Sequence, residues 1–379
     1  MTEPVTGSKP SARFYQPELD ALRFLAFLAV FLHHKSNPEL LLPHLPHKHW
    51  LETLVWSLHI AGAYGVHLFF LLSSYLITRL LRREVASTGH LDLRSFYIRR
   101  ILRIWPLYFF FLALCAVLAW VGFAETTPLS FYLSALFFVG NWYLVLGNPV
   151  WFPMVLLWTL SVEEQFYICW PILLRKAKRA HILNVAVATI VLSQGSLMLI
   201  RWLGQTADRQ VSFNTFNQVQ FFGLGALLAL WAEDRALQMT FPRRLLLAIA
   251  GAALVTFGAL FDPRTHALTL GLVTYNVAYL FSALGCIALF RAFLGLPANF
   301  FPGWILFFGR ISFGLYIFNI FSAETAKRLC RGHASLAVEM LLTVALNFGL
   351  ATASWFLLEK PFLRLKSRFE VVKSRPVSA

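Results

Sequence analysis

Long hydrophobic stretches, separated by short polar and mostly basic segments, run through almost the whole chain. An α-helix needs about 20 apolar residues to cross the hydrocarbon core of a bilayer. The pattern therefore predicts an all-α polytopic membrane protein with about ten transmembrane helices. We expect them at residues 20–36, 59–80, 101–123, 151–174, 181–203, 216–232, 244–261, 268–290, 303–323 and 334–358.

A further apolar stretch, residues 131–146, is short and is interrupted by Gly140 and Asn141. Basic loops lie on the cytoplasmic side of a membrane, and the chain has four: residues 79–103, 175–179, 243–244 and 360–368. All four share one side only if residues 131–146 do not cross. We therefore predict a re-entrant or interfacial segment there, on the outer side, and both termini in the cytoplasm. The basic residues 327–331 then lie outside, against this trend.

Composition supports the membrane assignment. The 379 residues are 58% hydrophobic and 16% aromatic, and only 13% are charged, whereas a soluble domain carries about 25% charged residues. The mean hydropathy is +0.64. The net charge of +15 resides in short loops, which indicates contact with anionic membrane lipids rather than with nucleic acid.

The four cysteines are far apart and form no metal-binding pattern; they are Cys115, Cys169, Cys286 and Cys330. Three of them fall in apolar stretches, where cysteine is a small packing residue. We therefore expect no disulfide framework and no metal site.

Arg23 and His34 lie in the first hydrophobic stretch, eleven residues apart. Eleven helical steps bring them to the same face, about 16 Å apart along the axis, whereas His33 is rotated by about 100°. A charged group at membrane depth costs roughly 3 kcal/mol, so both residues are functional candidates. The alternatives are an arginine that reaches the interface and a histidine that only marks a helix end.

His67, Glu163 and Glu164 also lie within predicted spans. His67 either bonds to a neighbouring helix or belongs to a site. The two glutamates point about 100° apart on a helix, so they face different partners. One can face a cavity while the other pairs with an arginine, and a purely structural ion pair is the competing interpretation. A histidine kept neutral by an apolar site can accept a proton, as a general base must.

Arg99, Arg100 and Arg103 form a basic cluster at the predicted cytoplasmic start of the third span. Arg99 and Arg103 share a helix face. Guanidinium groups at a helix N-terminus form a good phosphate site. The alternative is that these charges only set the orientation of the helix.

Six motifs occur along the chain in an order that resembles acyltransferase family three, the bacterial membrane O-acyltransferases that modify sugars. They occupy residues 19–34, 65–73, 96–106, 158–167, 308–316 and 358–362. Each motif alone is weak, but their order is specific. The chain departs from the family pattern at His67, where Asp is usual, at Ser74, where Gly is usual, and at Asn319, where His is common. These departures concern substrate choice more than activity.

The resemblance implies an enzyme that moves an acyl group, most commonly acetyl, from acyl-CoA to a hydroxyl of a glycan. The acceptor would be lipopolysaccharide, exopolysaccharide, another glycan, a lipid-linked sugar or a glycosylated metabolite. The enzyme would be a multi-pass protein of the bacterial cytoplasmic (inner) membrane, in contact with membrane lipids and without a tightly bound cofactor. Neither the acceptor nor the oligomeric state follows from the sequence.

The resemblance also assigns roles to residues. His34 would be the base or a transient acyl carrier, and Arg23 would orient or bind the donor. Glu163 or Glu164 would position a basic partner. The CoA phosphates would bind Arg99, Arg100 and Arg103, and the substrate would contact His67, Ser73, Tyr316 and Asn319.

The expected domain organisation is a cytoplasmic tail (1–18), a transmembrane acyltransferase domain (19–362) and a basic cytoplasmic tail (363–379). We expect no appended esterase-like domain, so the chain would act alone or with a separate partner.

A secondary transporter of a small anionic or sugar substrate is the alternative function. It would also carry His, Glu and Arg within its spans. The sequence shows neither an inverted repeat nor a matching pair of broken helices, and its basic cluster lies on one side. These features favour an anionic cytosolic donor.

Overall fold

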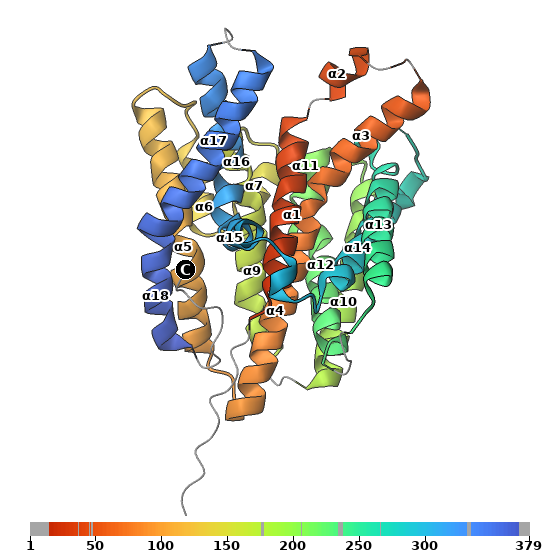
Figure 1. Ribbon diagram of the computed structural model, residues 1–379, viewed down its shortest axis with the longest axis vertical. Helices are drawn as coiled ribbons and strands as arrows, with labels where there is room; N and C mark the ends of the chain where they lie inside the picture. The colour runs from red at the N-terminus through yellow and green to blue at the C-terminus, as the bar shows by residue number, and fades with distance from the viewer. Residues whose placement is uncertain are drawn as a thin grey trace, which may run out of the picture.

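The computed structural model describes residues 15–36, 38–44, 46, 48–175, 178–205, 207–233, 238–265, 267–331 and 335–370, and within these ranges it contains helices but no β-strand (Figure 1). Six helical segments are long and apolar enough to cross a membrane. There are seven if α15 and α16, which meet at a bend of 74°, count as one broken span. The all-helical fold, typical of a polytopic membrane protein, is thus confirmed, while ten crossings stay a prediction.

The helices are α1 (Pro17–Lys35), α2 (Pro38–Leu41), α3 (His49–Ala63), α4 (Gly65–Thr88), α5 (Leu93–Trp120), α6 (Leu129–Leu136), α7 (Gly140–Val145), α8 (Phe152–Val155), α9 (Leu157–Leu173), α10 (Arg179–Trp202), α11 (Asp208–Ser212), α12 (Thr215–Trp231), α13 (Phe241–Ala259), α14 (Thr274–Phe293), α15 (Gly303–Arg310), α16 (Ser312–Cys330), α17 (Leu336–Ser354) and α18 (Lys360–Lys366). A π-helical turn, Trp355–Glu359, joins α17 to α18. A 3₁₀ turn, Ser367–Phe369, follows α18.

The first helix lies in the middle of the bundle and packs against α3, α4, α15 and α16 (Figure 1). Pro17 stands in its first turn together with the acidic Glu18, and the basic His34 and Lys35 stand in its last turn. Proline fits the first turn of a helix, and charges of these signs complement the helix dipole. Helices α5 and α18 pack together on one flank, and α13 and α14 on the other.

The predicted second span begins earlier than expected, because α3 and α4 form one long segment that changes direction at Tyr64. Glycines on both sides of this position pack closely on α1. A Cβ atom at Gly62 would lie 2.6 Å from the carbonyl oxygen of Ala29, and one at Gly65 would lie 2.7 Å from that of Ala26. Only glycine allows this approach, so the break is fixed against the central helix.

Residues 131–146 fold into two short helices, α6 with 8 residues and α7 with 6. Phe138 between them has a φ of 55°, a left-handed conformation that few residues other than glycine adopt. Neither helix approaches the roughly 20 residues needed to cross a bilayer.

Candidate active site

A cavity of about 170 Å³ lies between α1, α4, α5, α9, α16 and α18. Its charged lining consists of four cations, Arg23, Arg100, Arg103 and Lys366, and two carboxylates, Asp20 and Glu163. Ser73, Tyr167 and Tyr316 add hydroxyl groups. The cavity therefore joins residues from five of the six predicted motifs with one residue of the predicted C-terminal tail.

The first turns of α1 place one ion pair in this cavity. Arg23 Nη1 lies 3.2 Å from Asp20 Oδ1, and the Tyr15 hydroxyl donates to Asp20 Oδ2 at 2.9 Å. The Asp20 side chain is 1% exposed and that of Arg23 14%. A buried carboxylate needs such partners, so Asp20 fixes the position of the Arg23 guanidinium.

Helix α9 points three consecutive polar residues in three directions, as the 100° step between neighbours requires. Glu163 faces the cavity. Glu164 turns towards α5, where Trp105 Nε1 donates to its Oε2 at 3.3 Å. Gln165 donates to the Asn141 side chain on α7 at 2.9 Å. The contact with α7 thus fixes the rotation of α9 and selects Glu163 as the residue in the cavity.

The Ser73 hydroxyl of α4 donates to Glu163 Oε1 at 2.7 Å. Beside this contact, α12 presses on α4 at Gly225, where a Cβ atom would overlap the carbonyl oxygen of Leu71. The Glu163 carboxylate also interacts electrostatically with Arg23 and with Arg100. Ser73 and Glu163, which the sequence proposed separately, therefore form one unit among cations.

The predicted arginine cluster divides into two parts. Arg100 and Arg103 line the cavity, and the Arg100 guanidinium lies 5.4 Å from the centre of the Tyr167 ring, in cation–π range. Arg99 turns away: its Nη2 lies 3.0 Å from Glu84 Oε2. The Glu84 side chain is only 3% exposed, so this pair ties α4 to α5.

His34 lies at the opposite end of α1 from the cavity. Its ring centre is 5.0 Å from that of His33 and 6.5 Å from that of Phe152 on α8. Arg23 and His34 share one helix, but about 16 Å of helix axis separates them. The structure therefore places Arg23 and His34 towards opposite ends of α1 and does not bring them together.

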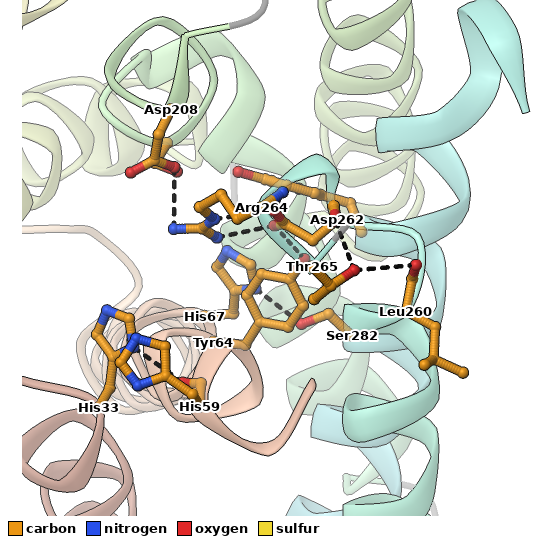
Figure 2. A network of polar contacts seen from close by, with 12 residues as sticks. His33, His59, Tyr64, His67, Asp208, Leu260, Asp262, Arg264, Thr265 and Ser282 are labelled. Atoms are coloured by element: carbon orange, nitrogen blue, oxygen red, sulfur yellow. Dashed lines mark hydrogen bonds and ion pairs between the residues drawn. The ribbon is translucent and has the colours of Figure 1, made fainter. Parts of the chain in front are cut away.

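His67 is buried in the first turn of α4, outside the cavity lining. Its Nδ1 lies 2.7 Å from the Ser282 hydroxyl of α14, and Figure 2 shows this bond. Its ring stacks on Phe221 at 3.9 Å and on Tyr64 at 4.9 Å. These contacts match the interpretation of His67 as a histidine bonded to a neighbouring helix.

Helix α16 carries a row of buried polar side chains that starts at the cavity. Tyr316 lines the cavity, and Asn319 and Ser322 follow at intervals of three residues. Within the described residues, the Tyr316 hydroxyl, both polar atoms of the Asn319 side chain and the Ser322 hydroxyl have no hydrogen-bond partner. Buried polar atoms are normally paired, so these atoms are available to a substrate or to water.

A second polar network braces the other side of the bundle (Figure 2). Arg264 lies 2.7 Å from Asp262 and 3.0 Å from Asp208, and the Tyr64 hydroxyl donates to Asp262 at 2.8 Å. Burial of Asp262 opposes its ionisation, but the Arg264 guanidinium outweighs this effect and holds the pKa of Asp262 below its usual range. The network joins the junction of α3 and α4, the start of α11 and the segment between α13 and α14. Sequence reasoning missed it because Tyr64, Asp208 and Arg264 are far apart in sequence.

Sequence reasoning also missed Lys366 and Tyr167 as cavity residues. Tyr167 stands four residues after Glu163, one helical turn away. This spacing could have predicted that the two side chains share a helix face. Lys366 lies in the segment predicted as a tail, and no local pattern places it beside Arg103. In the part of the chain that the structure describes, no cluster of His, Cys, Asp and Glu side chains could hold a metal ion.

Comparison with known proteins gives a consistent picture. The sequence model of acyltransferase family 3, described as an acyltransferase domain, matches residues 16–359. The chain is 33% identical over 237 residues to "Putative O-acetyltransferase SAS0844" of Staphylococcus aureus (strain MSSA476), covering 57% of this chain and 35% of that protein. It is 28% identical over 330 residues to O-acetyltransferase OatA of Staphylococcus aureus (strain NCTC 8325 / PS 47), covering 80% and 50%. The chain thus spans half or less of these relatives, and no solved structure matches it.

Proposed function

This chain belongs to acyltransferase family 3, and we propose that it is an O-acyltransferase that moves an acyl group from acyl-CoA to a sugar hydroxyl of a cell-surface or exported glycan. The relatives named as O-acetyltransferases make acetyl the first choice of acyl group. Membership of this family favours acyl transfer over the alternative of secondary transport.

The cationic cavity is the observation that carries the proposal. Arg23, Arg100, Arg103 and Lys366 meet there in a space with few acidic side chains. Guanidinium and ammonium groups bind phosphate oxygens through charge-assisted hydrogen bonds. The CoA part of the donor, which carries several phosphate groups, matches this lining. Arg100 and Arg103 stand near the start of α5, close to the basic segment that we place in the cytoplasm.

The acyl end of the donor would extend along α16 towards His34. Tyr316, Asn319 and Ser322 offer unpartnered polar atoms in this direction, within the described residues. The amide groups of an extended CoA arm need hydrogen-bond partners in a buried passage. Arg23 would therefore hold the donor at the cavity, and His34 would serve the reaction at the other end of α1.

The reaction needs two proton transfers and one exchange of acyl bonds. The acceptor hydroxyl oxygen attacks the thioester carbonyl carbon while His34 takes the hydroxyl proton as general base. The carbon–sulfur bond breaks and the CoA thiolate leaves with the bonding electron pair. The thiolate then receives the proton that His34 took up, which returns His34 to its neutral form, and the acceptor carries the new ester.

We place the protein in the bacterial cytoplasmic membrane with ten crossings and both termini in the cytoplasm. The mouth of the cavity then faces the cytosolic donor, and His34 lies near the outer face, where an exported or lipid-linked glycan is accessible. Residues 131–146 would form an interfacial segment on that outer side.

Transfer of labelled acetyl tests this proposal directly. Membranes that contain the wild-type chain or His34→Ala are incubated with labelled acetyl-CoA, and label is followed into lipid-linked and polysaccharide glycans. We expect label with the wild type and a loss of about 100-fold or more with His34→Ala, because general-base catalysis contributes about 10²–10⁴-fold.

His33→Ala is the matched control. It removes the adjacent imidazole, whose Nδ1 lies 2.8 Å from the His59 carbonyl oxygen. This control should keep most of the activity at equal protein level. Equal label with wild type and His34→Ala would remove His34 from the mechanism. Binding of acetyl-CoA without any labelled glycan would argue against the glycan acceptor, and no binding would argue against the donor.

A further inference from the structure

The C-terminal part of the described chain is fastened to the start of α5. Helix α18 packs along α5, and the 3₁₀ turn Ser367–Phe369 follows it there. Arg99 Nη1 donates to the Phe369 carbonyl oxygen at 2.7 Å, while Arg99 Nη2 pairs with Glu84 on α4. The segment is therefore held at the corner between α4 and α5, beside the cationic cavity.

This fastening brings a carboxylate into contact with a cation of the cavity. Lys366 lines the cavity with Arg100 and Arg103, and Lys366 Nζ lies 3.2 Å from Glu370 Oε1. The side chains of Lys366 and Glu370 are only 13% and 12% exposed. Surface ion pairs are usually well solvated, whereas this pair is largely enclosed against a group of cations.

We propose that Glu370 is an internal competitor for a phosphate-binding site formed by Lys366, Arg100 and Arg103. A carboxylate and a phosphate accept the same charge-assisted hydrogen bonds from an ammonium group. A bound phosphate group therefore takes the place of the Glu370 carboxylate at Lys366. The inference rests on the proposed function, since the cavity then receives a phosphate-bearing donor, but anion binding itself can be measured without any acyl transfer.

The competition has a definite sign. Removing the Glu370 charge takes away the carboxylate that pairs with Lys366 and makes the potential beside the cavity more positive, so phosphate anions bind more tightly. Removing the Lys366 charge deletes one ligand of the site, so they bind more weakly. When Lys366 is already replaced by a neutral residue, removing the Glu370 charge has a smaller effect on phosphate affinity.

The chain offers a matched control near the same end of α4. Arg82 Nε lies 2.7 Å from Glu233 Oε1, and the two side chains are 23% and 25% exposed. Neither residue lines the cavity that the structure describes. Glu233→Gln therefore removes the same charge from an ion pair without touching the proposed phosphate site.

The experiment is a calorimetric titration of the full chain in detergent with inorganic pyrophosphate at low ionic strength. Because an ion pair of this kind changes affinity by a modest factor, we expect Glu370→Gln to bind about threefold to tenfold more tightly than wild type. Lys366→Gln should bind more weakly by a similar factor. Glu233→Gln should match the wild type, and Lys366→Gln combined with Glu370→Gln should resemble Lys366→Gln. Thermal unfolding of each variant checks that it is folded.

Unchanged or weaker binding by Glu370→Gln overturns the proposal, as does an equal gain in Glu233→Gln, which would assign the effect to net charge. Absence of pyrophosphate binding in both wild type and Glu370→Gln overturns it as well. If the variants bind pyrophosphate as expected but the protein transfers no acetyl group, the proposed function is rejected and the phosphate site is supported. If the protein transfers acetyl groups but Glu370→Gln binds pyrophosphate like the wild type, the proposed function is supported and the competition is rejected.

Discussion

Glu163 and Glu164 are neighbours in sequence, but their carboxylates meet different surroundings. Glu163 accepts a hydrogen bond from Ser73 and lies among the cations of the cavity. Glu164 is buried beside Trp105, and its Oε1 has no hydrogen-bond partner within the described residues. The sequence predicted two directions for the pair but not which residue would face the site, because that depends on the contact between Gln165 and α7.

Glu163→Gln should therefore reduce acyl transfer strongly. The amide keeps the size and an acceptor oxygen for Ser73, but it removes the negative charge near Arg23 and Arg100. The hydrogen bond from Ser73 then loses its charge assistance, and the attraction to both arginines is lost; interactions of a charged group are worth about 1.5–3 kcal/mol, which corresponds to about 10- to 100-fold in rate. The measurement is label transfer from acetyl-CoA at equal protein level.

Glu164→Gln is the control for this prediction. Because Glu164 lies outside the cavity lining, its substitution should cost less activity than that of Glu163. An equal loss in both variants would show that the effect comes from charge in α9 and not from the cavity.

Helix α1 holds its place in the bundle through an unusually close contact with α15. The glycine at position 309 meets the backbone of α1 at Asp20, where a Cβ atom would overlap the Asp20 carbonyl oxygen. The contact lies directly behind the ion pair between Asp20 and Arg23. The packing of α15 and the position of the Arg23 guanidinium are therefore linked.

Gly309→Ala should separate α15 from α1. Overpacking of a tight contact costs about 1–3 kcal/mol, so we expect a lower midpoint of thermal unfolding in detergent together with weaker acetyl-CoA binding. Gly303→Ala, at the start of the same helix, has open space around the added methyl group and should change neither quantity. A fully stable Gly309→Ala protein with wild-type binding would contradict the close packing.

At the scale of the whole molecule, the features that depend on local sequence patterns could be predicted. Hydrophobic stretches indicated the helices, while the charge of the loops predicted that residues 131–146, interrupted by Gly140 and Asn141, do not cross. The motifs pointed to Arg23, Ser73, Glu163 and Tyr316, which the structure brings to one cavity. The contact of Arg99 with Phe369 and the position of Lys366 could not be predicted, because they depend on contacts between segments more than 200 residues apart.

The polar network around Arg264 makes the stability of the whole molecule depend on pH in a predictable way. A carboxylate whose pKa is lowered in the folded state stabilises the fold above the pKa of the unfolded chain, about 3.9 for Asp. This stabilisation is lost as the pH falls through the lowered pKa of Asp262. The wild-type unfolding temperature should therefore fall as the pH is lowered from 5 to 3, in part through this group.

Asp262→Asn should unfold at a lower temperature than wild type at pH 7 and should show a shallower decrease between pH 5 and pH 3. Asp208→Asn is the comparison, because its carboxylate also pairs with Arg264 but is 44% exposed. It should cost less stability, since exposed pairs contribute little. A pH profile of Asp262→Asn parallel to that of the wild type would contradict the assignment.

The cavity takes Asp20 from the first helix and Lys366 from the last. A ribosome that makes this chain must add more than 300 residues after Asp20 before the two can meet. The nascent protein then passes through membrane insertion without a finished anion site, and it gains one only when α18 docks on α5. Acquisition of donor affinity would thus report the docking of α18.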